Sequence, residues 1–215
     1  AEDGIRDRSP SRGLGDVYKR QQLVKEPGIY SCWGDSNYSC EMINYHDHEW
    51  GEPLKDDLKL FEFLILEGMQ AGLSWSTILM KRDAFRNALD GFDPEKISKY
   101  DSKKIEQLLE NPSIIRNRNK LESVILNSQA FIEISTHFGS FSEYVWSFVE
   151  SKTIQNNFKD MFLVPSRTKE SELMSQSLKS RGFKYVGPVI CYSFMQAAGM
   201  VNDHVIACFR WRELR

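Results

Sequence analysis

The sequence lacks the features that mark several classes of protein. No apolar run approaches the roughly 18 residues that a membrane-spanning helix needs. The N-terminus has no apolar h-region of a signal peptide, and only four cysteines occur in 215 residues. Because two of these cysteines lie close to histidines in the sequence, they suggest metal ligands rather than a disulfide scaffold. We therefore expect a cytoplasmic, monomeric protein with no membrane partner.

The sequence also lacks a large excess of positive or negative charge and a regular alternation of apolar and polar residues. The formal net charge is −2, so a nucleic-acid-binding function has to depend on local basic patches. Neither internal repeats nor sustained period-two alternation is found, and apolar residues instead recur at helical spacing. The sequence thus predicts an all-α fold. The expected helices cover residues 60–67, 74–90, about 116–131, 141–150, 171–181 and 189–200, with short helices after residues 92–94 and 100–102.

Residues 1–21 differ in texture from the rest of the chain. They contain nine charged residues and almost no apolar periodicity, which is typical of a disordered segment. Back-translated, residues 1–7 and 11–21 look like the two constant parts of a transposase-type sequencing adapter, with residues 8–10 as the variable index. We interpret this segment as an assembly scar outside the fold, and residues 22–215 as one domain.

The most informative stretch lies at residues 60–82. Its first half is an apolar helix that carries one carboxylate, Glu67, where an unpaired charge is costly. Gly68 and Gly72 bracket a turn whose backbone can approach a ligand, and Ser74 is a suitable N-cap for the next helix. Trp75 follows directly. This combination favours a pocket, although a core helix hairpin with a glutamate that reaches solvent also accounts for it.

Four cysteine and histidine positions have spacing that suits a metal. His204 and Cys208 are four residues apart, which places both on one face of a helix and forms half of a zinc site. Cys32 with either His46 or His48 is the obvious other half, and a closed site of two cysteines and two histidines is structural rather than catalytic. Two alternatives remain open. In the first, the four residues are unrelated buried side chains that bind no metal. In the second, the segment 46–49 forms an open hydrolytic metal site, which leaves the pair at 204 and 208 unexplained.

Basic and aromatic residues provide two further candidates. Arg116, Arg118 and Lys120 follow a proline-led turn at the start of a long helix, where they can grip a phosphate backbone; a solvated charged face is the ordinary explanation. A second basic cluster with the same two explanations comprises Lys179, Arg181 and Lys184.

Aromatic side chains are a separate candidate. They can stack on an extruded base while a buried carboxylate binds the edge of that base, but aromatic residues are also common in protein cores. The candidates of this kind are Trp33, Tyr45, Trp50 and Trp75, with Glu67.

Taken together, these motifs resemble the DNA-3-methyladenine glycosylase I family. The resemblance extends from about residue 31 to residue 208. It rests on Cys32-Trp33-Gly34 and on the segments 45–51, 66–75, 114–120, 141–148, 184–187, 191–197 and 202–204, with Cys208. It implies a fold of the helix-hairpin-helix glycosylase superfamily. It also implies monofunctional excision of N3-methyladenine from double-stranded DNA that contains alkylated bases. One structural zinc would tie the two chain ends together.

Residue by residue, the resemblance assigns three sets of positions. The zinc ligands would be Cys32, His46, His204 and Cys208, with His48 at a position that is not a ligand. Glu67 would be the catalytic residue, and Tyr45, Trp75, Trp50 and Trp33 would bind the base. The DNA contacts would come from the probing turn Gly72-Leu73 and from a hairpin at about residues 105–127 that includes Arg116, Arg118 and Lys120.

Two questions follow from this assignment. The hairpin has Asn119 where the family pattern leads us to expect glycine, which predicts an altered turn and a weaker phosphate contact. The rival hypothesis is a zinc-containing lesion-binding module that has lost glycosylase activity. Intact Glu67, Tyr45 and Trp75 argue against that hypothesis.

Overall fold

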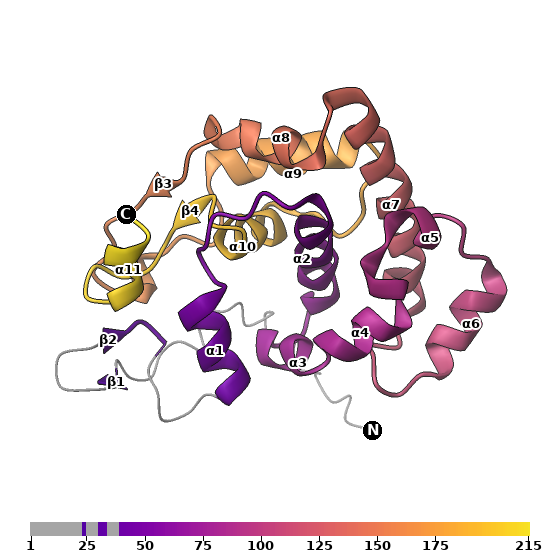
Figure 1. Ribbon diagram of the computed structural model, residues 1–215, viewed down its shortest axis with the longest axis horizontal. Coiled ribbons are helices and arrows are strands. Elements are labelled where there is room, and N and C mark those ends of the chain that lie inside the picture. The colour runs from indigo at the N-terminus through magenta and orange to yellow at the C-terminus, as the bar shows by residue number, and fades with distance from the viewer. Residues whose placement is uncertain (1–22, 25–29, 34–38) are drawn as a thin grey trace, which may run out of the picture.

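A computed structural model describes residues 23–24, 30–33 and 39–215 of the chain (Figure 1). The prediction for residues 1–21 lies outside the described residues. The described part is mostly helical, as the sequence predicted. Among those residues no helix is long and apolar enough to cross a membrane.

The elements follow one another with short connections. The α-helices are α1 Cys40–His48, α2 Asp57–Gln70, α3 Trp75–Met80, α4 Arg82–Ala88, α5 Pro94–Ile97, α6 Ser102–Glu110, α7 Arg118–Phe138, α8 Phe141–Trp146, α9 Lys169–Ser180, α10 Pro188–Ala197 and α11 Phe209–Glu213. Short 3-10 helices cover Asp90–Phe92 (η2), Ser147–Val149 (η3) and Met161–Leu163 (η4). Two-residue strands form an antiparallel pair, β1 Leu23–Val24 with β2 Tyr30–Ser31, and a parallel pair, β3 Ile154–Gln155 with β4 Val201–Asn202.

Helix α2 is the central element of the fold. In Figure 1 it lies in the middle of the molecule, between α10 and α7, and it packs against both. Asp56 caps its N-terminus by accepting a hydrogen bond from the backbone N–H of Lys59 at 2.9 Å. Nine of its fourteen residues are buried, because neighbouring helices surround it. The adjacent Asp57 carboxylate accepts hydrogen bonds from the first backbone N–H groups of α8, which fixes α8 across the core.

The predicted continuous helix over residues 74–90 is wrong. Ser74 does cap its start, accepting from the backbone N–H of Thr77 at 3.2 Å. The chain then bends at Lys81 (φ −99°, ψ 0°), which separates α3 from α4. The Lys81 ammonium donates to the carbonyl oxygens of Pro112 and Ser113 at 3.4 and 3.0 Å. The bend at Lys81 is therefore accompanied by tertiary contacts, and the sequence contains no glycine or proline there that would have predicted it.

The predicted hairpin region contains α6, the connection 111–117 and the first half of α7. Asn117 caps α7 and accepts a hydrogen bond from the backbone N–H of Lys120 at 3.2 Å. Asn119 is the second residue of α7 and has a helical conformation. The expectation that Asn119 alters the turn is therefore wrong, because the position does not need the positive φ that glycine provides.

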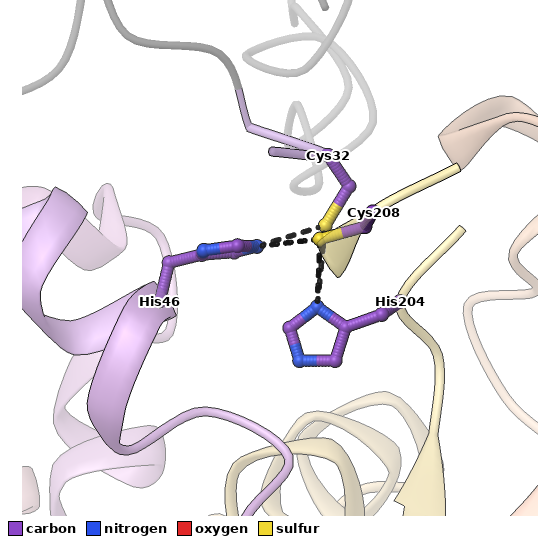
Figure 2. Close-up of side chains that lie close together, drawn as sticks. All are labelled: Cys32, His46, His204 and Cys208. Carbon is purple, nitrogen blue, oxygen red and sulfur yellow. Dashed lines mark hydrogen bonds between the residues drawn. The ribbon is translucent and has the colours of Figure 1, made fainter. Parts of the chain in front are cut away.

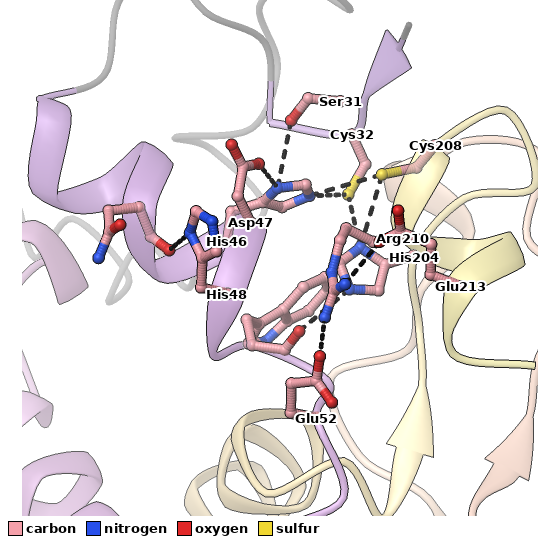
Figure 3. Close-up of polar contacts among 12 residues, drawn as sticks. Ser31, Cys32, His46, Asp47, His48, Glu52, His204, Cys208, Arg210 and Glu213 are labelled. Carbon is pink, nitrogen blue, oxygen red and sulfur yellow. Dashed lines mark hydrogen bonds and ion pairs between the residues drawn. The ribbon is translucent and has the colours of Figure 1, made fainter.

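Distant parts of the chain meet at one end of the molecule. Figure 1 shows β2, α1 and the C-terminal α11 together at the end opposite α5 and α6. Arg210 of α11 forms ion pairs with Glu52 and with Glu213, and the latter measures 2.6 Å (Figure 3). The backbone N–H of Gly51 also donates to the carbonyl of Gln196 at 3.1 Å. These contacts close the fold around the candidate site.

Candidate base pocket and metal centre

A cavity of about 180 Å³ lies between α1, α2, α10 and the segment 161–166. All five predicted pocket residues contribute to its wall. The complete lining comprises Trp33, Tyr45, Trp50, Glu67, Gln70, Trp75, Met161, Val164, Pro165, Ser166, Val189, Tyr192, Ser193 and Gln196. The wall is thus mainly aromatic and apolar, and Glu67 is the only acidic or basic side chain that the described residues contribute to it, a composition suited to a flat ligand that needs few polar contacts.

Glu67 is the electrostatic centre of this cavity. Its side chain is 3% exposed, and its Oε2 atom has no hydrogen-bond partner among the described residues. Burial raises the pKa of Glu67 to about 8, because the low-dielectric surroundings disfavour the carboxylate. The carboxyl group is therefore mostly protonated at neutral pH in these surroundings. A cationic ligand would reverse that preference.

The aromatic side chains form a connected wall. The ring centroids of Tyr45 and Trp75 are 5.4 Å apart, and those of Trp33 and Tyr45 are 5.9 Å apart. Trp50 continues the wall at 5.0 Å from Trp33. The indole N–H of Trp75 has no hydrogen-bond partner among the described residues. The cavity therefore offers broad π surfaces for stacking together with the indole N–H donor of Trp75.

The four residues predicted to bind metal lie together and are buried (Figure 2). Their ligand atoms are all within 4.8 Å of one another. The Cys32 Sγ atom is 3.0 Å from His46 Nε2 and 3.4 Å from His204 Nδ1. The Cys208 Sγ atom is 3.6 Å from the same nitrogen of each histidine. The cluster has the donors and the compactness needed to bind a metal ion.

Neighbouring groups orient both histidines (Figure 3). The Nδ1 atom of His46 is 2.8 Å from Asp47 Oδ1, and the Nε2 atom of His204 is 3.1 Å from the carbonyl of Trp50. Each histidine therefore directs its other nitrogen at the cluster, as metal ligands do. His48 is exposed and its Nδ1 atom lies 3.1 Å from the carbonyl of Asn44, so it is not part of the cluster.

The pKa shifts of Cys208 and His204 favour the forms of these side chains that bind a metal. Hydrogen bonds from Cys32 and from the two histidines lower the pKa of the Cys208 thiol. Burial has the opposite effect on Cys32 and raises the pKa of its thiol. Burial also lowers the pKa of His204 and favours its neutral, ligating form.

The local structure around His204 and Cys208 differs from the prediction. These residues do not lie on one helix, because the chain leaves β4 at Asn202 and α11 begins only at Phe209. A turn brings them together instead, with the backbone N–H of Cys208 donating to the carbonyl of Val205 at 2.8 Å. The spacing of four residues predicted the proximity correctly but not the backbone that produces it.

The predicted DNA-binding residues have two kinds of environment. Arg116 and Arg118 are exposed, and Arg118 pairs with Glu106 at 2.6 Å. Gly72 has a φ of +81°, and Leu73 beside it is 41% exposed. Lys120 is different, because its side chain is buried and its Nζ atom donates to backbone carbonyl oxygens. The prediction that Lys120 presents its charge to a phosphate is therefore corrected.

Comparison with known proteins establishes the relationship of the chain. A family model described as methyladenine glycosylase matches residues 33–211. The chain belongs to the methyladenine glycosylase family. It is 45% identical over 166 residues to the DNA-3-methyladenine glycosylase of Haemophilus influenzae, covering 77% of this chain and 90% of that protein. The DNA-3-methyladenine glycosylase 1 of Escherichia coli is also 45% identical, with 77% and 89% covered.

Solved structures of methyladenine glycosylases have the same fold. A crystal structure of 3-methyladenine DNA glycosylase I superposes with a TM-score of 0.79 at 44% identity, covering 81% of this chain and 95% of that one. A variant of 3-methyladenine DNA glycosylase I, crystallised in complex with 3-methyladenine, gives a TM-score of 0.79 at 36% identity, with 80% and 93% covered. The resemblance noted in the sequence is therefore confirmed at the level of family and fold.

The methyladenine glycosylase pocket of this chain also contains residues that sequence reasoning missed. Tyr192 and Gln196 are one turn apart on α10, and both donate to the buried carboxylate of Asp203, at 2.6 and 2.8 Å. Asp203 also accepts from Asn156 at 2.7 Å. Polar residues four apart on an otherwise apolar helix are the only sequence signal of this network. Gln70 and the segment 161–166 carry no comparable signal.

Proposed function

We propose that this methyladenine glycosylase hydrolyses the N-glycosidic bond of N3-methyladenine in double-stranded DNA, as the first step of base excision repair. The observation that carries the proposal is the unpartnered carboxyl oxygen of Glu67 inside an aromatic cavity. The names of the relatives and the 3-methyladenine complex of one of them support it. An enzyme that acts on a base must first extrude the nucleotide from the duplex.

Charge provides the basis for selecting the damaged base. Methylation at N3 makes the adenine of a nucleotide cationic and turns it into a good leaving group. A cation beside Glu67 favours the carboxylate, and the attraction is strong where water is excluded. Unmodified adenine is neutral and would leave the ionised form of Glu67 uncompensated. Stacking against Trp75 and Tyr45 is available to either base, so charge accounts for the discrimination.

The bond cleavage itself requires little from the protein. Water attacks the sugar carbon as the neutral base departs, and the pocket holds the extruded nucleotide in place. Among the residues that the structure describes, no lysine lines the cavity where it could form a Schiff base with the sugar. Strand cleavage is therefore not part of the proposed activity, which makes the enzyme monofunctional.

We also propose that the cluster of Cys32, His46, His204 and Cys208 binds one zinc ion. A sulfur and a nitrogen on the same tetrahedral zinc lie about 3.6 Å apart, and the four measured distances of 3.0–3.6 Å support this fit. Four protein ligands leave no coordination position for water, so the proposed role is structural. When bound, the ion would link residues 32 and 46 to residues 204 and 208.

DNA binding is proposed to involve two elements beside the pocket. Arg118 is the first residue of α7 and Arg116 lies just before its N-cap, and both would contact phosphates together with backbone amides of the hairpin. Leu73 protrudes from the turn between α2 and α3 and would enter the opened duplex. Both elements connect directly to α2 or pack against it, so contact with DNA occurs near the pocket.

The experiment that tests the proposal is chromatography of bases released from methylated duplex DNA. Free 3-methyladenine from an otherwise uncleaved strand supports a monofunctional glycosylase. Tight binding of the methylated duplex without any release would instead support the lesion-binding module. Equal release of unmodified adenine would contradict the charge-based account of selectivity.

A further inference from the structure

Lys120 occupies an unusual position for a lysine within a predicted DNA-binding hairpin. It is the third residue of α7, and only 6% of the residue is exposed. Its Nζ atom donates to the carbonyl oxygens of Met69 at 2.8 Å and Ala71 at 2.6 Å. Among the described residues it forms no ion pair with a carboxylate. A buried cation is costly, so this arrangement needs a compensating interaction.

The end of α2 provides that compensation. Met69 lies in the last turn of α2 and Ala71 is its C-cap residue, so both carbonyls belong to the negative end of the helix dipole. The last turn of α2 contains no basic residue of its own. The Tyr185 ring centroid lies 6.0 Å from the Lys120 Nζ atom, which adds a weak favourable contact. Burial lowers the pKa of the Lys120 ammonium, while the two carbonyl acceptors favour its charged form.

The same turn carries Leu73, the residue proposed to enter the duplex. Leu73 is held by a hydrogen bond from its backbone N–H to the carbonyl of Gln70 at 2.6 Å. Glu67 lies two residues before Met69 on the same helix. The backbone N–H of Lys120, in turn, is bound by the Asn117 cap of α7. Lys120 therefore bridges the start of α7 and the turn after α2 through its backbone and its side chain.

We propose that Lys120 is a positioning residue that couples the hairpin to the probing turn at Gly72-Leu73, and that it does not contact phosphate. The proposal deepens the proposed glycosylase function and rests on it. When the hairpin binds the DNA backbone, the bridge sets where Leu73 meets the duplex. Loss of the bridge would uncouple backbone binding from extrusion of the nucleotide.

The test compares Lys120→Met with Arg116→Met in binding to an abasic-site duplex over a series of salt concentrations. Each lost phosphate contact reduces the slope of log K against log salt by about 1. We expect Arg116→Met to reduce that slope. Lys120→Met should weaken duplex binding about tenfold with the slope unchanged, because it removes a rigid link and not a counterion-releasing contact.

The rate of single-turnover excision by Lys120→Met should fall at least as much as its duplex affinity. Affinity for free 3-methyladenine, measured by quenching of tryptophan fluorescence, should stay within about twofold of the parent value, because the aromatic wall is intact.

Lys120→Arg is a second variant that distinguishes a positioning role of Lys120 from a phosphate contact, and it can be used even if Lys120→Met fails to fold. A guanidinium binds phosphate at least as well as an ammonium does, so a phosphate contact would survive this change. In the buried space between two carbonyls the larger group fits poorly. We therefore expect Lys120→Arg to weaken duplex binding several-fold, again with an unchanged salt slope.

Three results would overturn the inference. The first is a salt slope lowered by about 1 in Lys120→Met, and the second is duplex affinity equal to that of the parent in either Lys120 variant. The third is a parallel loss of duplex affinity and free-base affinity in Lys120→Met. The parent enzyme is assayed for release of 3-methyladenine at the same time. Failure of the parent to release the base would contradict the proposed function. Failure confined to the Lys120 variants would contradict the positioning role alone.

Discussion

Glu67 shows how one side chain can combine a folding cost with a binding function. Its carboxyl oxygen is unpartnered among the described residues and lies in a cavity that has no other charged side chain. If Glu67 binds the edge of the base, Glu67→Gln should bind an abasic-site duplex as well as the parent does but lose affinity for free 3-methyladenine. Loss of one buried charge-assisted contact typically costs about 2–5 kcal/mol. Fluorescence titration with the base and anisotropy with the duplex measure the two affinities. Equal weakening of both would assign Glu67 a purely structural role.

The raised pKa of Glu67 also predicts how stability depends on pH. Between its ordinary value of 4.5 and the folded value of about 8, the unfolded chain has lost the proton that the folded chain retains. Stability contributed by this group therefore falls as pH rises through this range, by up to about 5 kcal/mol, and is level above it. Glu67→Gln removes the effect. Its free energy of unfolding relative to the parent should rise from pH 5 to pH 8 in urea titrations.

A matched control for the pH prediction is Glu133→Gln, which alters an exposed carboxyl group on α7. Its free energy of unfolding relative to the parent should stay constant over the same pH range. Using differences between variants removes the pH dependence of the metal ligands, which all variants share. A constant difference for Glu67→Gln as well would show that Glu67 is ionised in the folded protein.

At the level of elements, the turn between α2 and α3 has a backbone that only glycine adopts readily. Gly72 has a φ of +81°, and a β-carbon there would meet no atom within 4 Å. Gly91 has a φ of +71° and equally open surroundings, away from the pocket. Alanine at either site should therefore destabilise the fold by a similar amount, about 1 kcal/mol, through backbone strain alone. Only Gly72→Ala should also weaken abasic-duplex binding, because it displaces Leu73. Equal duplex affinities in the two variants would remove this turn from the DNA interface.

Helix boundaries show where local sequence signals are sufficient and where they are not. Ser74 begins its helix as predicted, because a hydroxyl at the N-cap satisfies a backbone N–H within three residues. The break at Lys81 was not predicted, because it accompanies contacts with carbonyls more than thirty residues away. Gly68 was assigned to the turn but lies inside α2, where a β-carbon would come within 3.3 Å of Tyr185 Cβ. Its requirement is close packing rather than a turn.

For the whole molecule, the metal cluster joins segments more than 150 residues apart. We expect the purified protein to contain one zinc ion per chain, and Cys208→Ala to lose zinc and to melt at a lower temperature. Closing so long a loop restricts the unfolded chain, so the ion should stabilise the fold. Cys40 is exposed and outside the cluster, which makes Cys40→Ala the matched control with full zinc content. Elemental analysis and thermal denaturation measure both effects. Undiminished zinc in Cys208→Ala would refute the ligand assignment.

The leader at residues 1–21 provides a prediction from composition alone. Its charged, aperiodic sequence has too few apolar residues to add to a core. Deleting residues 1–21 should leave the melting temperature and 3-methyladenine release unchanged. A melting temperature lower by several degrees would show that the segment belongs to the folded domain.

The sequence by itself determined the helical class and the family, and it predicted which groups carry the chemistry. Helical periodicity, capping residues and a charge within an apolar run are local patterns, and each follows from the energetics of a few neighbouring residues. The tertiary structure decided which of these groups meet. In the folded protein Lys120 donates hydrogen bonds to two backbone carbonyl oxygens. Tyr192 and Gln196 lie in the pocket wall, and a turn brings His204 and Cys208 together. Such outcomes depend on packing between segments far apart in the chain, and no local pattern encodes the distances between them.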